Sequence, residues 1–144
     1  MGKVSIVYWS GTGNTEAMAA AMAEGAKDAG AEVELLTVDK ADAAALSETK
    51  AFALGCPAMG AEVLEEGEME PFMAELDSQI AGKTIALFGS YGWGGGEWMR
   101  DWESRVAADG AAVLSGEGII ADNAPDDDVL AECRAAGAKL AALV

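Results

Sequence analysis

A loop of small hydroxyl, glycine and amide residues follows directly on a short apolar run at residues 4–9. An alanine-rich helical pattern begins immediately after this loop. A strand, a tight glycine-containing loop and a helix N-terminus form an anion site, because successive backbone N–H groups face one way and the helix dipole favours negative charge there. The residues of this candidate anion loop are Ser10, Gly11, Thr12, Gly13, Asn14 and Thr15.

The residues that the loop lacks limit the kinds of anion chemistry that it can support. A phosphate-transferring loop ends in Gly-Lys-Ser/Thr, but Gly13 is followed by Asn14, and no Lys or Arg lies within residues 4–26. The dinucleotide-binding pattern requires a third glycine where Glu16 stands. Without a cation to take up developing charge, the loop suits a phosphate that is bound and not transferred. The alternative is an ordinary turn that caps the helix through Asn14 or Thr15.

Two later loops each carry one large apolar side chain. Trp93 lies among five glycines within residues 89–96, and Met59 lies between Ala58 and Gly60. Such a side chain has little local sequence to pack on, so it either fills the core or contacts a planar ligand. For Met59 alone, core filling is the simpler interpretation. Beside a phosphate loop without cations, the two side chains together indicate a flat heteroaromatic ring with a phosphate tail, held between Met59 and Trp93.

The elements that must position these loops can be predicted from the apolar pattern. Strand-like runs alternate with helical patterns five times over 144 residues, a length typical of one domain. This alternation predicts an α/β fold, a three-layer α/β/α sandwich with a five-stranded parallel sheet, in which ligands bind beyond the carboxyl ends of the strands. Strands are expected at 4–9, 32–38, 51–54, 84–88 and 112–120 (with a break around 115–117), helices at 17–29, 39–47, 69–80, 97–108 and 124–143, and the later loops at 55–62 and 89–96.

The chain is strongly acidic. Its 25 Asp and Glu against nine Lys and Arg give a net charge of −16, which repels nucleic acid and anionic membranes and attracts basic partners. Solubility alone is the simpler explanation of such a charge, but the clustering of acids favours a docking face. No base lies between Lys50 and Lys83, whereas seven acids do: Glu62, Glu65, Glu66, Glu68, Glu70, Glu75 and Asp77.

Other residue types that the chain lacks argue against several classes of protein. It has no His, the usual general base at neutral pH, so nothing indicates a hydrolase. Cys56 and Cys133 are far apart and show no metal-ligand spacing, so we expect two buried apolar side chains and no metal site. No apolar run approaches the ~20 residues that span a bilayer, and no signal-peptide pattern opens the chain, so a cytoplasmic protein is expected.

Together, the three loops resemble those of the short-chain flavodoxins, small bacterial FMN proteins that carry single electrons. The resemblance covers essentially the whole chain and lies in three motifs that occur in the same order. These are the phosphate loop at 10–15, Met59 with Gly60 on one flavin face, and the loop at 89–94, whose Trp93 stacks on the other face. The resemblance implies non-covalently bound FMN and the flavodoxin strand order 2-1-3-4-5.

The resemblance also implies roles for individual residues. Met59 and Trp93 would flank the isoalloxazine ring, and the backbone N–H groups of Gly92 and Trp93 would face its N1 and O2 atoms. Glu62 would accept a hydrogen bond from flavin N3–H, and Asn123 would reach the ribityl chain. The phosphate would be bound by Ser10, Thr12, Asn14 and Thr15, and the full implied set is Ser10, Gly11, Thr12, Gly13, Asn14, Thr15, Pro57, Ala58, Met59, Gly60, Ala61, Glu62, Ser90, Tyr91, Gly92, Trp93, Gly94 and Asn123.

Two positions depart from the pattern of this family. Pro57 stands where relatives often carry a Ser near the phosphate, which removes a hydrogen-bond donor. Ala61 stands where an Asp often follows the glycine, which leaves the finer redox tuning open. In the family, the peptide that begins at the glycine flips so that its carbonyl accepts from N5–H of the semiquinone. Glycine at position 60 makes this flip inexpensive.

The function that the resemblance implies is a low-potential one-electron carrier that shuttles between the FMN semiquinone and hydroquinone, with no substrate turnover of its own. Its implied partners are redox proteins with basic docking faces, such as ferredoxin-type oxidoreductases and flavodoxin reductase, and a monomer is expected. The alternative is a flavodoxin-like FMN protein with a dedicated partner or a reductase activity, in ribonucleotide-reductase maturation or quinone reduction.

Overall fold

The computed structural model describes residues 2–11, 13–60 and 62–144, so the predicted site residues Thr12 and Ala61 lie outside the described part of the chain. Strands and helices alternate, as the apolar pattern predicts. The strands are β1 (Lys3–Tyr8), β2 (Glu32–Thr37), β3 (Ala51–Gly55), β4 (Thr84–Tyr91), β5 (Ala112–Val113) and β6 (Ile119–Asp122). The helices are α1 (Asn14–Asp28), α2 (Ala43–Leu46), α3 (Met69–Leu76), α4 (Glu97–Ala108) and α5 (Asp127–Ala141), with 3₁₀ turns η1 (Val38–Lys40) and η2 (Leu114–Gly116).

The strands form one parallel sheet in the order β2-β1-β3-β4-β5, with β6 also paired to β4. This order confirms the predicted arrangement 2-1-3-4-5. The fifth position, however, is filled by two strands, because β5 pairs with the beginning of β4 and β6 pairs with its end. The chain breaks between them where expected, since Ser115 and Gly116 have left-handed φ angles of 63° and 86°, which a strand cannot accommodate.

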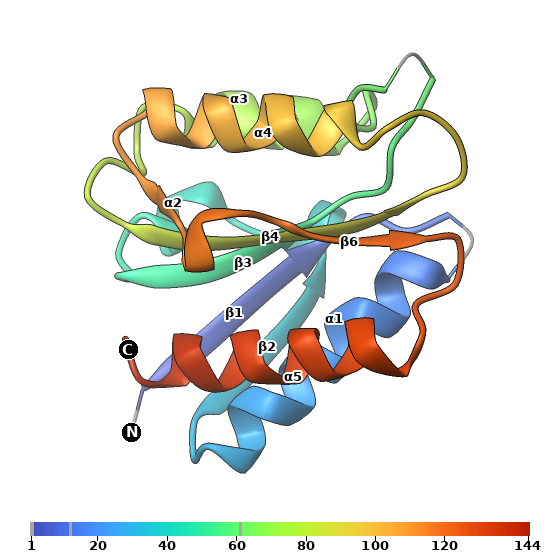
Figure 1. The fold of residues 1–144 in the computed structure, drawn as a ribbon. Helices are drawn as coiled ribbons and strands as arrows, with labels where there is room; N and C mark the ends of the chain where they lie inside the picture. Colours follow the sequence, from blue (N-terminus) through green and yellow to red (C-terminus); the bar gives the residue numbers. More distant parts are fainter. Residues whose placement is uncertain (1, 12, 61) are drawn as a thin grey trace.

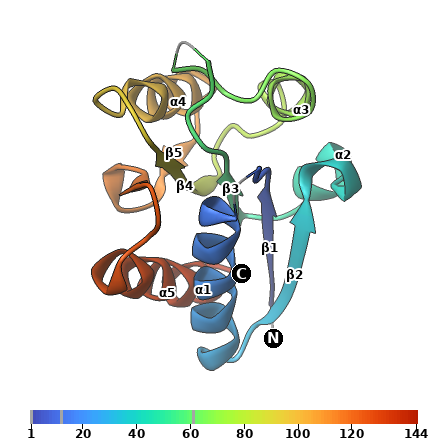
Figure 2. The ribbon, with the colours of Figure 1, turned by 90° about the vertical axis from the view of Figure 1, so that its right-hand side faces the viewer.

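Helices cover both faces of the sheet, which confirms the three-layer arrangement (Figure 1). Helices α1 and α5 pack on one face, and α3 and α4 pack on the other together with the short α2 (Figure 2). Successive side chains of a strand point to opposite faces, so Ile6 of β1 joins the core under α1 and α5, and Val7 joins the core under α3 and α4. All five residues of β3 are buried, as befits a central strand covered on both faces.

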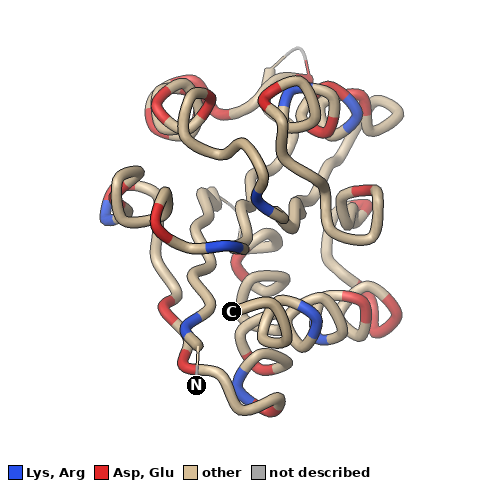
Figure 3. The backbone as a smooth tube through the Cα atoms, turned by 90° about the vertical axis from the view of Figure 1, so that its left-hand side faces the viewer, with Lys and Arg blue, Asp and Glu red and all other residues tan. Residues whose placement is uncertain are grey.

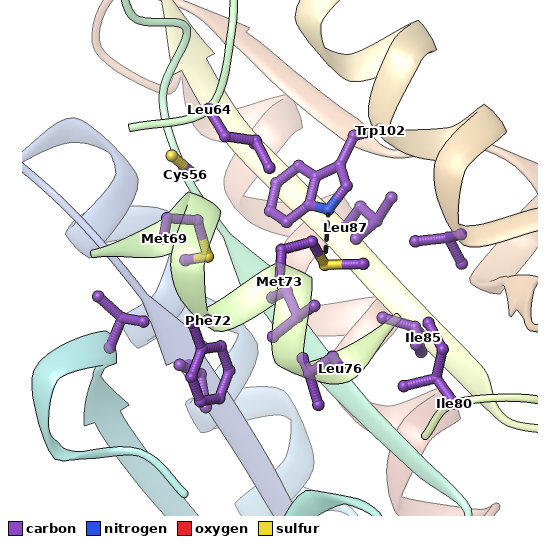
Figure 4. Packing of buried hydrophobic residues seen from close by; sticks show 14 of the residues in the cluster. Cys56, Leu64, Met69, Phe72, Met73, Leu76, Ile80, Ile85, Leu87 and Trp102 are labelled. Atoms are coloured by element: carbon purple, nitrogen blue, oxygen red, sulfur yellow. Dashed lines mark hydrogen bonds between the residues drawn. The ribbon is translucent and has the colours of Figure 1, made fainter. Parts of the chain in front are cut away.

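Two indole groups of α4 fix the helical layer above β3 and β4. The indole N–H of Trp102 donates to the sulfur of Met73 in α3 at 3.4 Å (Figure 4). The indole N–H of Trp98 donates to the backbone carbonyl of Cys56 at 3.0 Å, where β3 ends and the loop of Met59 begins. Cys56 and Cys133 are both fully buried, which confirms the prediction that they are core side chains.

Two element boundaries that bear on the site differ from the prediction. Helix α1 begins at Asn14 rather than at residue 17, and its N-cap is Gly13 with a φ of 94°, so neither Asn14 nor Thr15 caps this helix. Strand β4 continues through Tyr91, three residues into the predicted loop. The extension arises because Ser90 and Tyr91 pair with β6, a contact between segments distant in the sequence.

Candidate cofactor site

A cleft of about 230 Å³ opens where the loops after β1, β3 and β4 meet the end of β6. These loops lie at the carboxyl ends of the parallel strands, on the right in Figure 1 and facing the viewer in Figure 2. The position is the one expected for a ligand site in an open parallel sheet. The cleft is lined by Trp9, Gly11, Asn14, Pro57, Ala58, Met59, Ser90, Tyr91, Gly92, Trp93 and Asn123.

Every residue in this lining except Trp9 belongs to the predicted site. Trp9 ends the first apolar run and reads in the sequence as a core residue, although its place just before the phosphate loop could have indicated a site role. Its indole N–H donates to Glu68 Oε1 at 3.3 Å, which joins the first loop to the segment before α3. The other described residues of the prediction lie in the same loops but do not line the cleft: Ser10, Gly13, Thr15, Gly60, Glu62 and Gly94.

The first loop is shaped for an anion. The hydroxyl oxygen of Ser10 accepts hydrogen bonds from the backbone N–H groups of Gly13 at 3.1 Å and Glu16 at 3.4 Å, which leaves the Ser10 proton to donate. The first amides of a helix have no partner within it, so the N–H groups of Asn14 and Thr15 at the start of α1 are donors for a ligand.

The Thr15 side chain faces inward. Its Oγ1 lies 3.3 Å from Ser90 Oγ and also accepts from the Ser90 backbone N–H at 3.3 Å, and both residues are buried. This pair fastens the start of α1 to β4 and engages the Thr15 hydroxyl in the interior, so the Thr15 group that can serve an anion at the helix start is its backbone N–H. The sequence could not indicate the pair, because its members lie 75 residues apart.

The two large apolar side chains remain outside the packed core. Trp93 is 53% exposed, and Met59 is half-buried, so core filling does not account for either. Backbone N–H and carbonyl groups of Met59 and Val63 exchange two hydrogen bonds of 2.9 Å, which closes a tight hairpin around Gly60. Gly60 has a φ of 50°, as a glycine at this place permits.

Charge in and around the cleft is arranged for a ligand that brings its own negative group. None of the described residues that line the cleft has a charged side chain. Glu62 lies beside it with a left-handed φ of 55°, and its Oε1 accepts from the backbone N–H of Glu97 at 3.0 Å. The donors are therefore backbone amides, hydroxyls and the helix N-terminus, as suits a bound phosphate ester that is not transferred.

Comparison with known proteins identifies the fold and the family. The family model described as Flavodoxin matches residues 6–137. The chain belongs to the flavodoxin family. It is 48% identical to the flavodoxin of Clostridium beijerinckii over 124 residues, 86% of this chain and 89% of that protein. It is 47% identical to the flavodoxin of Megasphaera elsdenii over 135 residues, 92% of this chain and 98% of that protein. The solution structure of two-electron reduced Megasphaera elsdenii flavodoxin superposes with a TM-score of 0.86 at 45% identity, covering 94% of this chain and 98% of that one.

Membership of the flavodoxin family makes this protein an FMN-binding electron carrier that works with redox partner proteins. The matches extend over nearly the full length of two flavodoxins, so the alternative of a dedicated-partner or reductase protein is not favoured. The described helices include none with both the length and the apolar character needed to cross a bilayer.

Proposed function

We propose that the cleft holds FMN with its phosphate at the N-terminus of α1 and its ring between Met59 and Trp93. The observation that carries this proposal is the meeting of an exposed Trp, a half-buried Met and a cation-free anion loop in one uncharged cleft. Backbone N–H groups of Asn14 and Thr15 and the Ser10 hydroxyl bind the phosphate, and Gly13 caps the helix that presents these amides. The walls around the ribityl phosphate are shaped by Gly11, Pro57, Ala58, Ser90 and Tyr91.

The edge of the ring is held by polar groups of the later loops. The backbone N–H groups of Gly92 and Trp93 face N1 and O2 of the flavin, and Glu62 accepts from N3–H. Asn123 lies beside the ribityl chain, and its Oδ1 is so close to Gly92 that a Cβ there would stand 3.2 Å from it. Gly60 and Gly94 lie in the two ring-side loops without lining the cleft.

FMN, when bound, supplies the one-electron chemistry, and the protein sets its potential. The described residues that line the cleft include no Lys or Arg to pair with negative charge on the ring, and Trp93 is placed to cover one face of the ring. Such surroundings disfavour an extra negative charge, so the bound flavin is a low-potential donor. We propose that the chain acts over residues 1–144 as one cytoplasmic, monomeric domain that turns over no substrate and docks ferredoxin-type oxidoreductases and a flavodoxin reductase through their basic faces.

Titration of FMN into the FMN-free protein tests the placement of the ring. Trp93→Ala removes one of the two flanking side chains, so the FMN dissociation constant should rise by about tenfold or more. Leu143→Ala is the matched control, because Leu143 is an apolar side chain of similar exposure, 42%, in the last residues of the chain. An unchanged dissociation constant in Trp93→Ala would exclude the proposed ring position. Failure of the wild-type protein to take up FMN would overturn the proposal altogether.

A further inference from the structure

Helix α4 begins directly after the Trp93 loop without a cap from its own sequence. Its N-cap is Gly96, with a φ of 86° and no side chain to accept from the first amides. The amide of Glu97, the first helical residue, is instead satisfied by Glu62 Oε1 at 3.0 Å, 35 residues earlier in the chain. A carboxylate at this place also meets the positive end of the helix dipole.

Glu62 is fixed on the other side by its own turn. The hairpin between Met59 and Val63 is closed by two backbone hydrogen bonds of 2.9 Å, and Glu62 occupies it with a φ of 55°. A left-handed φ is unfavourable for a residue with a side chain, so the surrounding contacts must hold it. The capping bond to Glu97 is one such contact.

The carboxylate also lies directly on the backbone of the Trp93 loop. A Cβ on Gly94 would stand 2.6 Å from Glu62 Oε2, and Gly94 has a φ of 75°, so both the space and the backbone conformation require glycine there. Gly94 is the residue next to Trp93, and Met59 begins the hairpin that carries Glu62. Glu62 therefore links the supports of both side chains that face the cleft, because its backbone belongs to the Met59 hairpin and its carboxylate lies against the Trp93 loop and the start of α4.

We propose that Glu62 is a positioning residue that locks the Trp93 loop to the Met59 hairpin and so sets the gap into which the flavin ring fits. The lock is formed by this chain alone and does not require FMN. Oε1 holds the α4 amide, which leaves Oε2 to accept from flavin N3–H. The inference about ring fit rests on the proposed position of FMN, whereas the lock itself does not.

Amide hydrogen exchange at Glu97, measured by NMR on the full chain with and without FMN, tests the lock. Glu62→Asp keeps the charge but shortens the reach by one methylene group, and should speed exchange about fivefold or more in the FMN-free protein. Glu62→Gln keeps an acceptor at the same reach and should rescue part of the protection, because hydrogen bonds to charged groups are the stronger ones.

Glu66→Gln is the matched control, since Glu66 is an exposed acid of the same segment. If the amide of Glu97 exchanges at the same rate in Glu62→Asp as in Glu66→Gln, the proposed lock is overturned. This result does not depend on where FMN binds.

A double-mutant cycle on FMN affinity tests the positioning of Trp93. If Glu62 only accepted from flavin N3–H, the effects of Glu62→Asp and Trp93→Ala on the dissociation constant would multiply independently. If Glu62 holds Trp93 in place, truncating Trp93 should cost several-fold less affinity in the Glu62→Asp background than in the wild type.

Quenching of FMN fluorescence by the bound protein gives a second readout, because the quenching should weaken in Glu62→Asp and not in Glu66→Gln. Independent effects together with normal quenching would overturn the positioning role. No effect of Trp93→Ala alone would instead contradict the proposed ring position and leave the exchange result standing.

Discussion

The backbone conformation of Gly60 bears directly on the chemistry of the bound flavin. Its φ of 50° lies in the region that side chains disfavour, and the added Cβ would find open space, so the restriction is one of backbone conformation alone. A valine at this position resists the peptide rotation that the family resemblance implies. We expect Gly60→Val to bind FMN and to show a smaller yield of one-electron-reduced flavin in an anaerobic reductive titration.

Gly82 provides the control for this prediction. It has a φ of 81° and open space around its Cβ position, but it precedes β4 at the opposite end of the sheet. Gly82→Val should therefore cost comparable stability and leave the titration unchanged. A normal yield in Gly60→Val would show that peptide rotation at this residue is not involved.

Most of the residues that line the cleft could be predicted from the sequence, but the contacts between its loops could not. Met59 and Trp93 could be predicted because a large apolar side chain among glycines has no local packing partner. The hydroxyl of Thr15 could not be oriented, because its partner Ser90 lies 75 residues away. Trp9 was missed because an aromatic residue at the end of an apolar run resembles a core residue, and only its place just before the phosphate loop indicates otherwise.

The start of helix α3 depends on one carboxylate, that of Glu65. Oxygen atoms of Glu65 accept from the backbone N–H groups of Gly67 at 2.7 Å, Glu68 at 2.7 Å and Met69 at 3.0 Å. Burial raises the pKa of the Glu65 carboxyl, but these hydrogen bonds outweigh burial and hold its pKa below the ordinary value. Its contribution to stability is therefore full above the pKa of the unfolded chain and is lost as the pH falls through the native value.

Replacing Glu65 by Gln should lower the free energy of unfolding by about 1 kcal/mol at pH 7. At a second, acidic pH, low enough to protonate the Glu65 carboxyl in the folded state, the wild-type carboxyl and the substituted amide are both neutral and the difference should shrink. Urea unfolding at the two pH values measures it, with Glu66→Gln as the control. Equal destabilisation by both variants would show that the hydrogen bonds to the start of α3 contribute nothing measurable.

Asp77 and Asp109 lie together at the far ends of α3 and α4, and the pKa of Asp109 shifts in the opposite direction to that of Glu65. Asp77 receives hydrogen bonds from Arg105 at 2.7 and 3.0 Å and stays ionised. Burial, and then the neighbouring Asp77 carboxylate, raise the pKa of Asp109 to about 6 against a lowering by Arg105. Because this native pKa exceeds the unfolded value, the folded state holds an extra proton between roughly pH 4 and 6, and stability falls as the pH rises through that window.

Asp109→Asn should consequently raise the midpoint of thermal unfolding at pH 7.5, with a smaller gain at pH 5. Asp101→Asn is the control, because Asp101 is an exposed acid on the same helix. A gain that is equal at both pH values, or equal in the control, would contradict the assignment of the proton to Asp109.

Among the elements, the strands were the most predictable and their pairings the least. Continuous apolar runs predicted β3 and the first part of β4, because strands buried on both faces need no polar positions. The last residues of β4 read as a glycine loop and became strand only through pairing with β6. The break between β5 and β6 was visible locally, since Ser115 and Gly116 end a strand by backbone conformation alone.

Over the whole molecule, the segments that supply two of the three cleft loops are free of cations. The segments 4–26 and 51–82, which supply the loops after β1 and β3, contain no Lys or Arg. Lys3 begins β1, and Lys50 and Lys83 immediately precede β3 and β4, so these cations lie at the end of the sheet opposite the cleft, which faces the viewer in Figure 3. The cleft therefore opens at an acidic end, and a basic partner is attracted to that end first.

Two substitutions that change the net charge by the same amount distinguish the effect of where the charge lies from the effect of the net charge. Glu66→Lys adds a cation in the acidic segment beside the cleft, and Glu48→Lys adds one just before β3, at the other end; both side chains are exposed. In stopped-flow electron transfer to a basic redox protein, Glu66→Lys should slow the second-order rate constant severalfold and flatten its salt dependence, and Glu48→Lys should do neither. For the wild type, raising the ionic strength should slow the reaction markedly, while reduction by a small uncharged reagent stays constant. Equal slowing by both variants would mean that partners respond to the net charge of −16 and not to its position.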